Sequence, residues 1–120
     1  MSSINIVQGE DRVLTFTISE KDENGVTTYL DLTGATEIEL RAANSSSGYV
    51  SLKLSATEVT VLDAEKGTFR VHISDTKTAL LKLGADQSIE VVVDIGAPTA
   101  GERRIAQLTK AISVVKRLFP

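Results

Sequence analysis

The sequence has 120 residues, of which 42% are hydrophobic and 24% charged, and its formal net charge is −3. This size and composition are typical of one soluble globular domain, so we expect a single domain over residues 1–120. The absence of cysteine excludes disulfides, thiolate metal sites and a cysteine nucleophile.

Apolar and polar residues alternate in several stretches, which predicts half-buried β-strands. The pattern first appears where Leu14, Phe16 and Ile18 alternate with threonines. The alternating stretches are residues 14–18, 38–42, 50–54 and 69–73. Residues 89–95 are almost continuously apolar, as in a central strand, and residues 105–115 predict one long final strand.

Turn signals separate these strands. Asn24-Gly25 is a strong hairpin signal, and Gly34 is expected to make a compact corner. Residues 74–84 break the alternation, because they begin with the N-cap types Ser74 and Asp75 and end in glycine. The prediction is therefore an all-β antiparallel sandwich with one short helix near residues 75–83.

Candidate catalytic residues are few. The only histidine is His72, and strand alternation places it on the outer face. Ser74 and Asp75 are close to it in sequence, but triads are assembled from separated segments. Glu37 and Glu39 lie about 7 Å apart on one strand face, a separation that suits acid/base pairs, but that face is expected to meet solvent. We therefore predict no catalytic residue, no metal site, no cofactor and no enzymatic activity.

The charges are unevenly distributed along the chain. Residues 1–100 hold 8 Lys/Arg against 15 Asp/Glu, whereas residues 101–120 hold 5 against 1. The basic segment is either a solvated strand face beside acidic neighbours or a surface that docks to an acidic partner. Nucleic acid is not an expected partner because the chain as a whole is acidic. A membrane is not expected either, because no apolar run approaches the ~20 residues of a span.

Four stretches in this order resemble a known family. They are residues 6–11 around Gly9, residues 30–35 around Gly34, residues 67–73, and residues 78–84 ending in Gly84. The order is similar to that of small immunoglobulin-like domains of tailed phages, such as the N-terminal domain of baseplate upper proteins. Residues 85–87 depart from the family's aromatic strand residue. The sequence ends at Pro120, where the baseplate proteins continue into a linker and second domain.

The resemblance implies an immunoglobulin-like fold and a structural virion protein of the tail, baseplate or fibre-attachment region. Its expected partners are other virion or tail proteins and further copies of itself, as a trimer or hexamer. Its expected location is the virion, after assembly in the host cytoplasm. Three alternatives stay open: a carbohydrate-binding sandwich in host recognition, a capsid-decoration protein, and an enzyme, whose activity would need a clustered, buried polar site that the sequence does not show. The scarcity of aromatic residues, 4% with no tryptophan, counts against the first.

Assembly of such a domain is expected at strand edges, whose unpaired backbone groups a partner strand can complete. We expect these edges near the two ends of the sequence. The interface candidates are Ile4, Ile6, Lys116, Arg117, Leu118 and Phe119.

Overall fold

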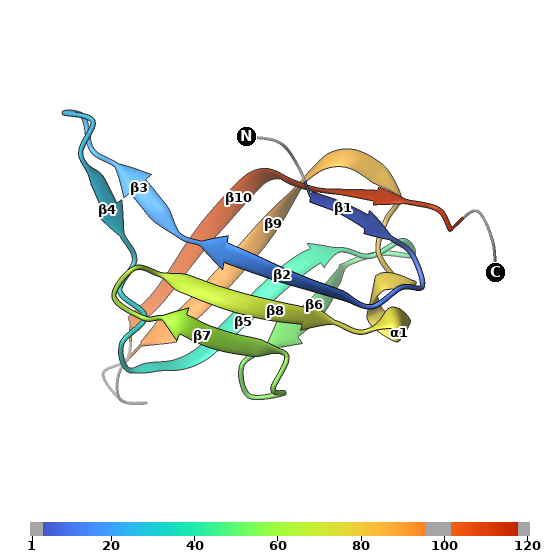
Figure 1. Ribbon diagram of the computed structural model, residues 1–120, viewed down its shortest axis with the longest axis horizontal. Helices are drawn as coiled ribbons and strands as arrows, with labels where there is room; N and C mark the ends of the chain where they lie inside the picture. Colours follow the sequence, from blue (N-terminus) through green and yellow to red (C-terminus); the bar gives the residue numbers. More distant parts are fainter. Residues whose placement is uncertain (1–3, 96–101, 118–120) are drawn as a thin grey trace.

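The computed structural model describes residues 4–95 and 102–117, with the backbone alone at residues 102, 104, 107, 109 and 110. This part of the chain forms ten strands and one short helix (Figure 1). In chain order they are β1 (Ile4–Val7), β2 (Arg12–Thr17), β3 (Ser19–Lys21), β4 (Thr27–Tyr29), β5 (Ala35–Ala43), β6 (Tyr49–Lys53), β7 (Val59–Asp63), β8 (Thr68–Ile73), α1 (Asp75–Thr78), β9 (Gly84–Ile95) and β10 (Glu102–Val115).

Two sheets form the layers of a sandwich, which confirms the predicted all-β fold. The larger sheet has the order β1-β10-β9-β5-β6, and the smaller one β2-β8-β7. Neighbouring strands are antiparallel, except that β1 runs parallel to β10, with Ile4 opposite Ile112. The predicted antiparallel arrangement holds for every other pair of neighbouring strands in the described residues. No tight turn joins β1 and β10, so their relative direction is not fixed by a hairpin.

The core lies between the two sheets and follows the predicted alternation. The inward positions of the alternating strands are buried, namely Leu14, Phe16, Ile18, Ile38, Leu40, Ala42, Val50, Leu52, Phe69, Val71 and Ile73. Strand β9 is central, as predicted, and is covered on both faces: Val91 and Val93 point into the core, while Val92 is buried on the outer side. The rings of Phe16 and Phe69 meet at a centroid distance of 5.9 Å.

The helix is shorter than predicted. Ser74 caps α1, its side chain accepting a hydrogen bond from the Lys77 amide, but the helix ends after four residues. The following segment is tied to the end of β5, because Lys82 N donates to Ala43 O at 2.9 Å. This pairing extends the backbone and carries Leu81 into the core. Gly84 therefore begins β9 and does not end a helix.

The turn at Gly9 is fastened to this helix. The Thr78 hydroxyl, which is fully buried, accepts a hydrogen bond from Gly9 N at 3.1 Å and donates to Glu10 O at 2.9 Å. Gly9 has a φ of +82°, a conformation that favours glycine. Two of the stretches that carry the family resemblance thus meet in space at one hydroxyl group.

A hairpin of β3 and β4 projects from the sandwich (Figure 1), and residues 19–29 are called the arm below. The hairpin at Asn24-Gly25 is confirmed. Asp22 Oδ1 accepts hydrogen bonds from the amides of Asn24 and Val26, and Gly25 has a φ of +80°. Every residue of both arm strands is exposed. The arm is thus a hairpin that buries neither face.

Candidate functional site

Strand β10 has an unpaired edge beside the arm. On one side, residues 102–108 pair with β9. On the other side lies β1, which reaches only Ile112–Val115 of β10. In the described part of the chain no strand pairs with this side of residues 102–108, which is called the open edge below. Such an edge presents a row of backbone donors and acceptors that a further strand can complete.

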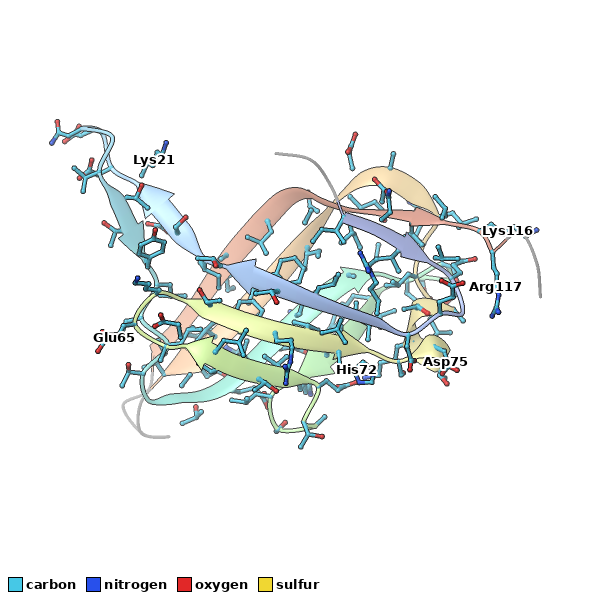
Figure 2. All side chains as sticks on the ribbon, in the orientation of Figure 1. Lys21, Glu65, His72, Asp75, Lys116 and Arg117 are labelled. Carbon is cyan, nitrogen blue, oxygen red and sulfur yellow. The ribbon has the colours of Figure 1, made fainter. Side chains whose placement is uncertain are left out.

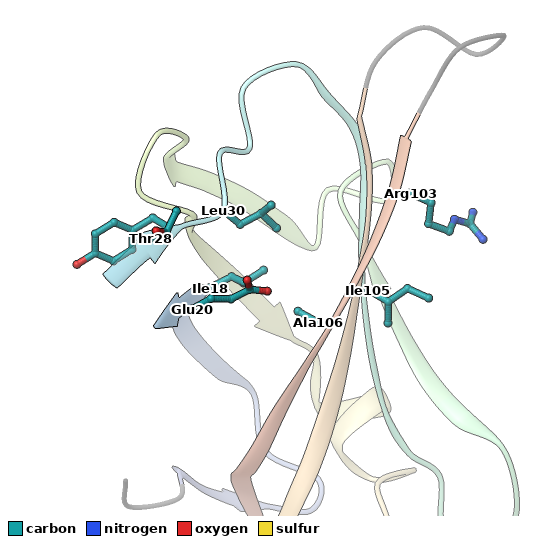
Figure 3. A pocket seen from close by; sticks show the side chains of 8 residues that line it. Ile18, Glu20, Thr28, Leu30, Arg103, Ile105 and Ala106 are labelled. Carbon is teal, nitrogen blue, oxygen red and sulfur yellow. The ribbon is translucent and has the colours of Figure 1, made fainter. Parts of the chain in front are cut away.

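A groove of about 340 Å³ lies between the arm and this edge. Its lining includes Ile18, Glu20 and Leu30 on the arm side and Ala106 on β10. Figure 3 shows these four side chains between the arm and β10, whereas Arg103 and Ile105 point off the opposite side of β10. The groove therefore combines an apolar floor, a carboxylate and free strand backbone. This combination suits an extended peptide segment.

The edge at β6 is closed by side chains. Lys77 Nζ donates to the Ser51 carbonyl at 2.7 Å, and a Glu58 oxygen accepts from the Lys53 amide at 3.1 Å. Lys77 and Glu58 also form an ion pair at 2.5 Å. These contacts occupy backbone groups that another strand would use. Charged side chains placed along an edge are a known protection against unwanted pairing, and the open edge at β10 shows no such contact among the described residues.

The outer face of the larger sheet carries a network of paired charges. Arg41 binds Glu39 at 2.7 Å and Glu90 at 3.2 Å, and its guanidinium lies 4.7 Å from the centre of the Tyr49 ring. Ser51 donates a hydrogen bond to the second Glu39 oxygen. Glu39 points away from the core, as the alternation predicts, yet this cover leaves it only 9% exposed. The expectation that Glu39 meets solvent is therefore wrong.

The two carboxylates considered for acid/base chemistry have lowered pKa values. Burial acts to raise the pKa of Glu39, but hydrogen bonds from Ser51 and Arg41 outweigh it and lower the value. Burial also acts to raise the pKa of Glu37, but hydrogen bonds from Ser55 and from the Ile38 amide outweigh this effect and lower the value. Both groups are held as carboxylates, whereas a general acid needs a raised pKa.

This network makes the stability of the protein sensitive to acid. A carboxyl group whose folded pKa is lowered stabilises the fold above its unfolded pKa, here the ordinary value of 4.5, and loses that effect as pH falls through the folded pKa. We expect the urea midpoint of the native protein to fall when pH is lowered from neutral to below 4.5. The Glu39→Gln variant should show a smaller fall. Glu65→Gln, at an exposed turn outside the network, is the matched control. If both variants reduced the acid-induced fall of the urea midpoint by the same amount, Glu39 would have no special role.

His72 lies exposed on β8, as predicted. Its Nε2 atom is 3.8 Å from a carboxylate oxygen of Asp11, which is also exposed. Asp11 accepts a hydrogen bond from the Asp75 amide at 2.6 Å. The contact of His72 is thus with a loop carboxylate at the surface.

The residues expected at an interface lie in two different environments, the core and the surface. Ile6 is fully buried in the core and Ile4 packs against it, so these side chains hold β1 to the sandwich. Lys116 and Arg117 are exposed just beyond β10, and Figure 2 shows them at the opposite end of the molecule from Lys21 in the arm. Leu118 and Phe119 lie outside the described residues.

Comparisons with known proteins do not assign the chain to a family. A scan against protein-family models and a search of curated proteins both find no match. Among the described residues, no helix is long and apolar enough to cross a membrane. In the same part of the chain, no three His, Asp or Glu side chains are grouped so that they could hold a metal ion.

Proposed function

We propose that this chain is a structural subunit that assembles with further copies of itself and with partner proteins. The observation that carries this proposal is the arm. A two-stranded hairpin is marginally stable in water unless it packs against something, and both faces of the arm are exposed. Contact with another chain supplies the burial that the arm lacks within one protomer.

The resemblance in the sequence narrows this proposal to a virion protein of the tail, baseplate or fibre-attachment region, built as a trimer or hexamer. A capsid-decoration protein would use the same kind of contact and differs in its place in the virion. A carbohydrate-binding module has less support, because Tyr49 is already stacked on Arg41 and the only other tyrosine is Tyr29 in the arm.

Sedimentation of the full chain from low micromolar to near-millimolar concentration tests this proposal. We expect the mass to rise to one discrete oligomer, a trimer or a hexamer, as closed symmetric assemblies do. A mass that stays at that of one protomer over the whole range would contradict self-assembly. The Glu39→Gln variant is a suitable control, because Glu39 is covered and should leave the oligomer unchanged.

A further inference from the structure

The arm and the open edge are complementary parts of one surface. We propose that the arm of one copy lies along the open edge of β10 in a second copy and extends its larger sheet by a strand. This inference rests on the proposed self-assembly and names the contact that produces it.

The backbone geometry supports this pairing. The open edge offers residues 102–108 with β9 on one side only, and β1 does not reach them. The arm is already a β-ribbon, so its strands need no refolding to add to a sheet edge. Pairing of this kind supplies main-chain hydrogen bonds over its whole length, and adjacent side chains set the register.

The charges of the arm and of the open edge indicate that the segment bound at the edge comes from a second copy of the chain. The arm is acidic, because it contains one basic residue, Lys21, and three acidic residues, Glu20, Asp22 and Glu23. Within residues 102–108 the open edge has two arginines, Arg103 and Arg104, against Glu102, and Arg103 also pairs with Asp94 of β9 at 2.7 Å, so the edge is weakly basic. Opposite charges on the two contact surfaces favour their encounter and disfavour arm-to-arm contact. One chain therefore carries both halves of a complementary pair.

Exposed hydrophobic side chains on the arm and on β10 also support this arrangement. Val26 near the arm tip is 57% exposed and Ile105 on β10 is 64% exposed, although both are large and hydrophobic. The groove floor of Ile18, Leu30 and Ala106 is also apolar. A strand laid along the open edge covers the groove floor on one face of β10 and approaches Ile105 on the other face, together with the unpaired backbone. Because the arm and the edge are different surfaces, the contact is head-to-tail, which closes into a ring when the rotation between copies allows it.

Disulfide trapping between separately purified single-cysteine variants tests the contact, and the native chain contains no cysteine to interfere. Thr28→Cys in the arm is mixed with Ile105→Cys on β10 and oxidised. We expect a covalent pair of chains, and no such pair when Thr28→Cys is mixed with Val13→Cys, which is exposed on β2. A Thr28/Ile105 double-cysteine variant that closes only within one chain would show that the arm folds onto its own protomer and would overturn the inference.

Charge reversal gives an independent readout. Glu23→Lys at the arm tip should weaken association by about three- to tenfold, because it removes one attraction and adds one repulsion. Glu10→Lys makes the same change at the exposed turn beside β1 and should leave association unchanged; circular dichroism checks that both variants fold. If the oligomer persists with full affinity in Glu23→Lys, this contact is wrong while the proposed self-assembly stands. If the native chain never associates, both fail.

Discussion

The Phe69→Ala variant is expected to lose about 3–5 kcal/mol of its free energy of unfolding, the usual cost of removing a large aromatic ring from a core. Phe69 is 0% exposed at the centre of the smaller sheet and packs on Phe16. The sequence holds only three phenylalanines and no tryptophan, so the rest of the core is mainly small and aliphatic.

Urea unfolding followed by far-UV circular dichroism measures this loss. Val13→Ala is the matched control, because Val13 lies in the same sheet with 54% of its surface exposed. Its free energy of unfolding should stay within about 0.5 kcal/mol of the native value. A loss below about 1 kcal/mol for Phe69→Ala would mean that the two sheets close over the missing ring.

Gly67→Ala is expected to cost about 2–4 kcal/mol, from backbone strain and overpacking together. Gly67 has a φ of +62°, which disfavours any residue with a Cβ atom. A Cβ atom there would lie 2.7 Å from Leu30 O and 2.9 Å from Ile18 O, both of them backbone atoms. Ile18 and Leu30 form the base of the arm, where Ile18 N donates to Gly67 O at 3.0 Å.

Gly34→Ala separates the two contributions to this cost. Gly34 has a similar φ of +76°, but a Cβ atom there meets nothing within 4 Å. It should therefore show only the backbone cost of about 1–2 kcal/mol. Equal losses at Gly34 and Gly67 in thermal or urea unfolding would show that the two carbonyls move aside. The larger loss at Gly67 would show that the arm base is held rigidly against the β7–β8 turn.

The core and the positions of most long strands along the chain could be predicted because alternation is a local signal. Apolar residues two positions apart, such as Phe69 and Val71, lie on the same face of a strand and so indicate which face is buried. The helix was overestimated because its end is set by a distant contact, Lys82 with Ala43, and capping residues do not report it. The direction of β1 depends on a strand more than a hundred residues away and has no local signal either.

The candidate site was harder to predict from the sequence. The burial of Glu39 comes from Arg41 on its own strand together with Ser51 on the next, so one strand's pattern cannot reveal it. The open edge at β10 depends on how far β1 reaches along it. The arm did leave a signal, because residues 19–21 and 27–29 contain only one hydrophobic residue, Tyr29, and lack apolar alternation. A hairpin without an apolar face has no side chains to pack against the core, so it is expected to project from the sandwich.

The parallel pair of β1 and β10 also governs when the protein can become native. Ile4 pairs with Ile112, so the larger sheet is complete only after β10, residues 102–115, has been synthesised. Pairing across such a sequence distance requires closure of a long loop, and β-sandwiches accordingly fold in about milliseconds to seconds. Until then, β1 has no partner strand and β9 lacks its neighbour on one side. The edge proposed for assembly therefore does not exist until β10 has been made, so newly made chains cannot associate through it at an earlier stage.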